Sequence, residues 1–242
     1  MRTALALTAG LLTTCLAHAE VISFTNSSTQ GLSAATGTAA GANLCSSKGL
    51  CSTAIQYQTT AGGVLTVTAA DSPDVDSLAL VNQSSFSNAG LGVVTGYESS
   101  LLHKFVIVDG DYSLSAHKET LTLSFSSQVS LSQLIFFPND RSSYALTHEL
   151  DAFDGFTLSV DGGAFVEYSF GTHGGQPVNF NTPLVGSTFT FGYAKKMSIE
   201  NYYLAALQVS PTSAVPEAGT SALMALGLAG VVAAAWRRRQ TA

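Results

Sequence analysis

The chain has 242 residues and a formal net charge of −6, and 46% of its residues are hydrophobic but only 11% charged. Soluble domains average about 25% charged residues, so apolar stretches must lie beside a polar body. Residues 20–212 contain six Lys/Arg and fifteen Asp/Glu, and this acidic balance argues against a nucleic-acid partner, whose phosphates need basic patches.

The first nineteen residues have the layout of a secretory signal peptide. Arg2 precedes an apolar stretch at 4–16, and Ala17-His18-Ala19 follows it. A positive start, a short apolar region and an A-x-A site are typical of signal peptides, and the apolar region is too short to span a bilayer. We therefore predict a signal peptide over 1–19, cleaved after Ala19, and a mature chain that begins at Glu20.

The three cysteines fall into two groups. Cys15 lies inside the predicted signal peptide, where lipidation is a weaker alternative because Thr14 stands where a smaller residue is wanted. Cys45 and Cys51 remain in the exported chain, and an even pair in an oxidising compartment indicates a disulfide. A metal or redox pair is the alternative, but no histidine neighbours the two cysteines and the spacing suits zinc poorly.

The body begins with weakly patterned sequence and continues as short strands. Residues 26–48 are rich in Ser, Thr, Gly and Ala, which predicts a loosely ordered loop or edge held by the disulfide. Runs of alternating polarity follow at "AIQYQTT", "GVLTVTA", "LALVN", "KFVIVDG", "VSLSQLIFFP", "STFTFGY" and "YYLAALQV". In the last run, alternation places Tyr203, Ala205, Leu207 and Val209 in one inward row.

Residues 120–126, "TLTLSFS", show the alternation most clearly. Leu121, Leu123 and Phe125 share one face, and the Thr and Ser residues between them share the other. This pattern predicts a half-buried strand with one wet face.

A hairpin is predicted at 156–170. Phe156, Leu158 and Val160 share a parity, Asp161-Gly162-Gly163 supplies turn residues that tolerate positive φ, and alternation resumes at Ala164, Val166, Tyr168 and Phe170. With about nine or ten strands in 20–212, we expect a mainly β chain, built as a single antiparallel β-sandwich of jelly-roll-like form.

Catalytic motifs are few and incomplete. Ser115–Lys118 fits S-x-x-K, but it leads into a strand and the companion motifs of serine acyl-enzymes are absent. His148-Glu149 begins like a zinc-protease helix but lacks the second histidine, and the other body histidines are scattered at 103, 117 and 173. We therefore expect no enzymatic activity; an unrecognised hydrolase is the alternative.

Acidic clusters leave a calcium site open as an alternative to ordinary turn chemistry. No twelve-residue EF-hand pattern occurs, so no cofactor is predicted. The clustered residues are Asp71, Asp74, Asp76, Asp109, Asp111, Asp151 and Asp154.

The C-terminal segment 213–242 has a membrane-anchor pattern. Residues 218–236 carry no charge and as a helix would extend ~28 Å, close to the hydrocarbon thickness. Arg237, Arg238 and Arg239 follow Trp236 directly. By the positive-inside rule these arginines stay cytoplasmic, so a transmembrane helix would hold the body outside the inner membrane, in the periplasm.

Val215, Pro216 and Glu217 precede this span, and the order of motif, apolar span and arginine cluster resembles the PEP-CTERM sorting signal of exported bacterial proteins. The sequence departs from the name-giving motif at Ala218, where a second proline is usual. The resemblance implies recognition of residues 215–217 by an exosortase-type enzyme, a transient anchor, and a stop-transfer role for the three arginines. Such proteins move to the cell surface or an exopolysaccharide matrix.

Two functions follow as hypotheses. The first is an exported, non-enzymatic surface or matrix protein sorted through its tail by an exosortase. The alternative is a carbohydrate-binding module, calcium-assisted or not, that binds matrix polysaccharide. Exposed aromatics would stack on its sugars, and the candidates are Tyr97, Tyr112, Tyr144, Tyr202 and Tyr203.

Overall fold

The computed structural model describes residues 18–25, 35–45, 49–71, 78–84, 90–99, 104–107, 114, 119–138, 155–170, 177–194 and 202–212, with backbone alone at 84, 97–99, 104–107 and 138. Two compact units divide at Pro211 and Thr212. Several predicted features lie outside the described residues: the signal-peptide core, Cys15, the sorting motif, the span 218–236 and Arg237–Arg239. Within the described part, no helix is long and apolar enough to cross a membrane.

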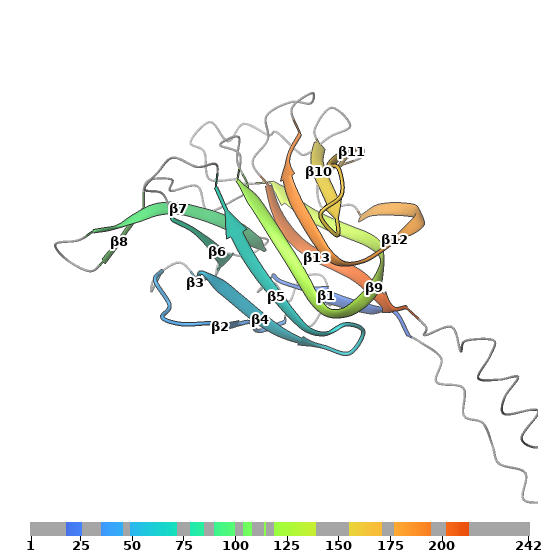
Figure 1. Cartoon of the computed structure of the whole chain (residues 1–242), viewed down its shortest axis with the longest axis horizontal. Coiled ribbons are helices and arrows are strands. Elements are labelled where there is room, and N and C mark those ends of the chain that lie inside the picture. The colour runs from blue at the N-terminus through green and yellow to red at the C-terminus, as the bar shows by residue number, and fades with distance from the viewer. Residues whose placement is uncertain are drawn as a thin grey trace, which may run out of the picture. The chain divides into compact units, whose positions relative to one another are not determined.

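The described residues form strands and no helix (Figure 1). The strands are β1 (Glu20–Ser23), β2 (Thr38–Ala39), β3 (Gly49–Ser52), β4 (Ala54–Thr59), β5 (Gly63–Ala70), β6 (Leu78–Ser84), β7 (Leu91–Ser99), β8 (Lys104–Ile107), β9 (Thr120–Pro138), β10 (Gly155–Val160), β11 (Val166–Ser169), β12 (Pro177–Tyr193) and β13 (Tyr202–Pro211). The predicted mainly β fold is confirmed, although the jelly-roll form stays a prediction.

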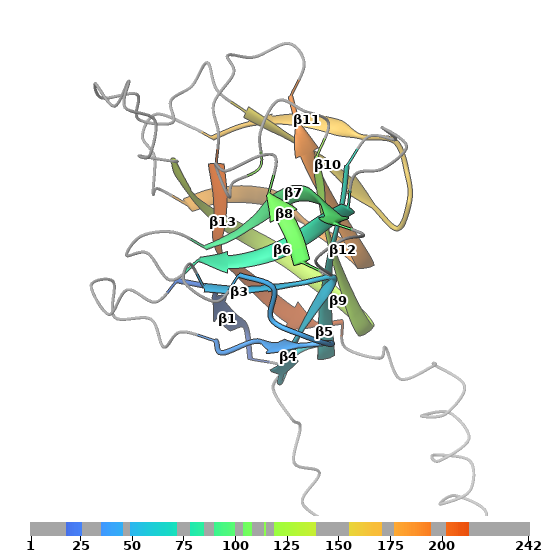
Figure 2. The same ribbon diagram turned by 90° about the vertical axis from the view of Figure 1, so that its left-hand side faces the viewer.

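All the strands join one antiparallel, barrel-like sheet with the order β11-β10-β12-β9-β13-β7-β6-β3. β1 pairs with β13, β8 with β7, and a branch β2-β4-β5 joins through β9. In Figure 2, β3, β6 and β7 run across the direction of β9 and β12. The sheet therefore curves so that its own inner faces enclose the core.

The curvature depends on the nineteen-residue strand β9. Its first part pairs with β5, and its second part pairs with β13. Between them, the register with β12 shifts at Gly186/Thr188, as expected where a bulge bends a strand. Ser126 holds this corner: its hydroxyl donates to the Gly62 carbonyl and accepts the Val64 N–H, both at 3.1 Å.

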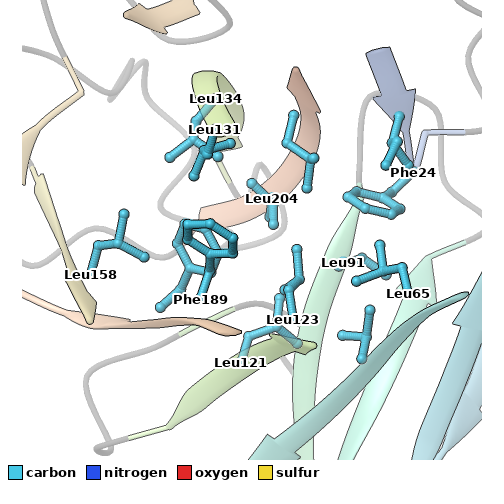
Figure 3. Packing of buried hydrophobic residues seen from close by; sticks show 14 of the residues in the cluster. Phe24, Leu65, Leu91, Leu121, Leu123, Leu131, Leu134, Leu158, Phe189 and Leu204 are labelled. Atoms are coloured by element: carbon cyan, nitrogen blue, oxygen red, sulfur yellow. The ribbon is translucent and has the colours of Figure 1, made fainter. Parts of the chain in front are cut away.

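The main core fills the space inside the curved sheet. Figure 3 shows side chains from β5, β9, β12 and β13 converging there. Leu121 and Leu123 are buried while Thr122 between them is only half-buried, so the predicted strand with one wet face is confirmed. Aromatic rings fill one part of the core: Phe136 packs on Phe156 at 4.6 Å and on Phe170 at 5.0 Å between ring centroids.

A second, smaller cluster covers the other face of β13. It contains Leu80, Val94, Tyr203 and the two cysteines. The predicted disulfide is present between Cys45 and Cys51. The Asn43 carboxamide oxygen accepts the N–H of both cysteines, at 3.1 and 3.0 Å.

Residues 35–45, the described part of the region 26–48, contain more regular structure than the sequence predicts. Thr38 and Ala39 form β2, which pairs with Gln56 and Ile55 of β4. The segment is therefore tied to the sheet by main-chain hydrogen bonds as well as by the disulfide.

The predicted hairpin is confirmed. Phe156 pairs with Tyr168 and Leu158 with Val166. Asp161 and Gly162 both have positive φ, 49° and 72°, and the Gly163 N–H donates to the Val160 carbonyl at 2.9 Å. Positive φ at both central positions is the type I′ geometry that Asp-Gly favours.

The predicted inward row of β13 is wrong in its first half. Tyr202 and Leu204 face the main core, whereas Tyr203 lies in the second cluster. A register shift between Leu204 and Ala206 then changes the parity, so that Leu207 and Val209 face the main core as predicted. Because a bulge inserts one residue, strict alternation cannot hold along the whole strand.

Candidate functional surface

Two of the five tyrosines predicted to bind sugar are buried. Tyr202 and Tyr203 are 0% and 3% exposed, so neither ring can stack on a ligand, and this prediction is wrong for both. Both faces of β13 are covered, one by the main core and the other by the disulfide cluster. The Tyr97 side chain, Tyr112 and Tyr144 lie outside the described residues.

The candidate metal and catalytic residues are mostly outside the described residues as well. Asp71 is described and has an interaction partner. Among the described residues, no group of three or more His, Cys, Asp or Glu could hold a metal ion. The remaining candidates, at 74, 76, 103, 109, 111, 115–118, 148–149, 151, 154 and 173, lie outside.

A buried acidic group lies at the start of β9. Glu119 is 0% exposed and accepts a hydrogen bond of 2.9 Å from the Thr95 hydroxyl. Burial, with the nearby Glu119 charge, raises the pKa of Tyr202. The phenol therefore keeps its proton and donates to the Gly192 carbonyl at 3.0 Å. These contacts link β7, β9, β12 and β13 inside the sheet.

Gln83 joins four parts of the chain from a buried position. Its carboxamide oxygen accepts from the Tyr57 hydroxyl at 3.1 Å and from the Gly37 N–H at 3.3 Å. Its amide nitrogen donates to the carbonyls of Phe24 at 3.3 Å and Ala35 at 2.8 Å. Burial raises the pKa of Tyr57, so its phenol stays a donor. All four hydrogen-bonding capacities of the amide are used, which indicates a structural role.

Hydroxyl side chains gather on the outer side of β2, β4, β5, β9, β12 and β10, which we call the hydroxyl face; Ser159 and Gly192, at its β10 and β12 end, are buried. Three transverse rows cross it, each made of residues directly opposite one another in neighbouring strands. The rows are Thr38, Gln56, Thr66, Ser124 and Thr188; Ala54, Thr68, Thr122, Thr190 and Ser159; and Ala70, Thr120, Gly192 and Thr157.

Two hydroxyl groups on this face are in contact across neighbouring strands. The Thr122 and Thr190 hydroxyls are 3.1 Å apart across β9 and β12. Neighbouring strands are spaced about 4.8 Å apart, and every second residue along a strand returns to the same side about 6.7 Å further on. The face therefore presents a two-dimensional array in which each threonine offers a hydroxyl and a methyl group.

An exposed aromatic residue borders this array. Phe165, between β10 and β11, is 52% exposed. Its ring lies beside Gly192, since a Cβ built on that glycine would be 3.7 Å from the Phe165 Cε1 atom and 3.0 Å from the Thr157 hydroxyl oxygen. The exposed phenylalanine therefore places a flat apolar ring directly beside threonine hydroxyl groups.

The three rows contain no charged side chain; Glu167, opposite Thr157 in β11, stands at their margin. The sequence predicts part of this arrangement, because Thr120, Thr122 and Ser124 are assigned to a wet face. The sequence does not single out Phe165, although its parity is opposite to that of the predicted apolar row Ala164, Val166, Tyr168 and Phe170. A large apolar residue at a position predicted to face solvent is the signal that could have identified it.

Comparison with known proteins identifies one sequence motif. Residues 214–239 match the PEP-CTERM protein-sorting motif, which contains the predicted Val215–Glu217 motif and Arg237–Arg239. The chain is thus consistent with a PEP-CTERM sorting-domain protein, and the motif implies export and membrane-associated sorting. Among curated proteins, none matches the chain.

The solved structures that resemble the chain are carbohydrate-binding modules of very low similarity. A family 32 CBM from C. perfringens NanJ, solved with galactose, has 11% identity, a TM-score of 0.28, and coverage of 60% of this chain and 92% of its own. CpGH89CBM32-5 from Clostridium perfringens, solved with GalNAc-β-1,3-galactose, has 15% identity, a TM-score of 0.26, and coverage of 61% and 95%. Similarity at this level carries no argument about a ligand.

Proposed function

We propose that this chain is an exported, non-enzymatic surface or matrix protein, sorted through residues 213–242 by an exosortase-type enzyme. The observation that carries the proposal is the sorting motif at 214–239, placed directly after a β body that ends at Pro211. In this proposal Val215, Pro216 and Glu217 are recognised, residues 218–236 span the inner membrane, and Arg237–Arg239 remain cytoplasmic.

The β body is the cargo in this proposal. A signal peptide cleaved after Ala19 would release Glu20 as its first residue, and Glu20 already begins β1. The disulfide between Cys45 and Cys51 supports an oxidising destination, since structural disulfides form and persist outside the cytoplasm. We further propose that the body is a single jelly-roll-like domain.

Expression of the full chain and of a chain lacking residues 213–242, in a host with an exosortase and in a strain without it, tests the sorting step. The full chain is expected at the cell surface or in the matrix of the first host and in the inner membrane of the second. The shortened chain is expected in the periplasm or medium of both. Equal distribution of the two chains in the exosortase host would refute the proposal.

A point variant separates recognition from anchoring. Pro216→Ala/Glu217→Ala changes the motif but keeps the apolar span and the arginines, so it is expected to stay in the inner membrane. Ser210→Ala, just ahead of the tail, is the matched control and is expected to be sorted like the unmodified chain.

A further inference from the structure

We propose that the hydroxyl face, with Phe165 at its edge, binds an uncharged polysaccharide chain. The proposal goes beyond sorting, because it assigns the body a ligand and a surface. It rests on side chains that two structural observations bring together: the rows of hydroxyls across β5, β9 and β12, and the exposed Phe165 ring beside Gly192.

The hydroxyl array suits a sugar polymer on chemical grounds. A pyranose ring has hydroxyl groups at its rim and C–H groups on its faces, so it needs polar and apolar contacts at the same place. Thr66, Thr122 and Thr190 each supply a hydroxyl and a methyl group, and all three are half-buried. Because β-branched side chains are stiff at χ1, little side-chain entropy is lost when a ligand orders them.

Phe165 supplies the stacking plane. Its ring is 52% exposed although phenylalanine gains free energy on burial, and its edge helps to cover the buried Gly192 on the outer side of β12. Thr157 and Thr120 border the same glycine, with 3.0 and 3.6 Å from their nearest atoms to a Cβ built there. These three side chains together cover Gly192, so a sugar that stacks on the exposed part of the Phe165 ring would lie next to both threonines.

The distribution of charge favours an uncharged polymer over an acidic one. The three rows carry no charged side chain, whereas residues 20–212 as a whole contain six Lys/Arg and fifteen Asp/Glu. An acidic polysaccharide would be repelled by the body and would find no cation on the face. A second copy of the chain would bring the same excess of negative charge. An uncharged polymer is not repelled by the acidic body and needs no cation on the face, so it is the ligand that we propose.

The test is affinity electrophoresis of the purified full-length chain in mild detergent, through gels that contain soluble uncharged glucans or galactans, with alginate as an anionic comparison. The unmodified chain is expected to be retarded by at least one uncharged polymer and not by alginate. Phe165→Ala is expected to weaken that binding about tenfold through loss of stacking. Val166→Ala, at the neighbouring exposed position, is the matched control and is expected to bind normally.

A second pair of variants tests the array itself. Thr66→Lys places a hydrated charge in the first row and is expected to weaken binding about tenfold. Thr182→Lys makes the same change at an exposed position of β12 outside the rows and is expected to bind normally. Near-UV circular dichroism confirms that each variant is folded.

Three results would overturn the proposal: no retardation by any uncharged polymer, retardation by alginate alone, or equal binding by Phe165→Ala and Val166→Ala. Sedimentation that shows a dimer, dissociated by Thr66→Lys, would assign the face to a second copy instead. Each result concerns the purified chain, so it leaves the sorting proposal to its own cell-fractionation test.

Discussion

Gln83 is the buried residue whose polar contacts should matter most for stability. Gln83→Ala would leave the Tyr57 hydroxyl, the Gly37 N–H and two carbonyls without their partner. Each buried group left unpaired costs about 1–3 kcal/mol, and partial rehydration lowers the sum. We expect a loss of about 3 kcal/mol in the free energy of unfolding, measured by urea denaturation of the purified chain.

Gln133→Ala is the control for Gln83→Ala. The Gln133 amide donates to Asn179 at 2.8 Å, but that pair is exposed to solvent, so water replaces the bond and the loss should stay below ~1 kcal/mol. Similar losses for both variants would mean that the Gln83 network adds no stability.

Asp161 gives a prediction for pH. The pKa of its carboxyl is lowered by the backbone N–H groups of Thr188 and Ser187, and also by the Ser187 hydroxyl. A lowered pKa in the folded state means that the carboxylate stabilises the protein above its ordinary pKa, and that this contribution is lost as the pH falls through the lowered value.

Asp161→Asn removes the charge but tolerates the positive φ at this position. Because the carboxylate is solvent-exposed, screening should limit its contribution to less than ~1 kcal/mol at neutral pH. The stability difference between the unmodified chain and the variant is expected to shrink towards zero in urea titrations as the pH falls from 7 to about 2. A difference that stays constant over that range would contradict the assignment.

Glycine is needed for two different reasons in this sheet: at Gly90 for its lack of a side chain, and at Gly162 for its freedom to adopt a positive φ. A Cβ on Gly90, just before β7, would overlap the Leu204 carbonyl oxygen and lie 2.7 Å from the Ala205 Cα atom of β13. Backbone cannot yield as a side-chain tip can, so Gly90→Ala should lower the free energy of unfolding by about 3 kcal/mol.

Gly162→Ala is the comparison for Gly90→Ala. A Cβ at Gly162 would meet nothing within 4 Å, but its φ is 72°, so only the dihedral strain remains, about 1 kcal/mol. Urea denaturation of both variants measures the two costs. A smaller loss for Gly90→Ala than for Gly162→Ala would mean that β7 and β13 separate easily.

Elements with one polar face could be predicted from the sequence. β4, β5 and the first part of β9 alternate clearly, and the hairpin of β10 and β11 adds its turn signal. β7 could not be predicted in this way because Leu91–Thr95 are buried in succession, so no alternation exists. For β9 the sequence predicts two separate runs, because one bent strand differs from two strands only in its long-range pairing.

The candidate surface shows the same limit at the scale of the molecule. The polar parity of β9 could be predicted from Thr120, Thr122 and Ser124, but the rows arise only when β5 and β12 align their own threonines beside it. The chemistry of tyrosine suits sugar binding, yet Tyr202 and Tyr203 are on a strand that is covered on both faces. Exposure follows from tertiary packing, which one sequence does not reveal.

The two ends of the β body lie side by side. β1 pairs antiparallel with β13, with Glu20 opposite Val209, so the N-terminus predicted for the mature chain and the strand that leads to the tail are about 5 Å apart between Cα atoms. The Glu20 carboxylate also accepts the Thr60 and Ala61 N–H groups, at 2.7 and 2.8 Å. The first residue after the predicted cleavage site is thus bound to the sheet.

Adjacent ends predict that a circular permutant folds. A short Gly/Ser linker from Thr212 to Glu20, with the chain opened between Gly162 and Gly163, leaves every strand of the described body uncut. It is expected to keep the near-UV circular dichroism of the native β body, with lower stability because one turn is lost. A permutant opened after Leu204 would interrupt β13, the strand that lies between β7 and β9 in the sheet, and it should not fold. If both permutants fold equally well, the continuity of β13 is not what holds the ends and the sheet together.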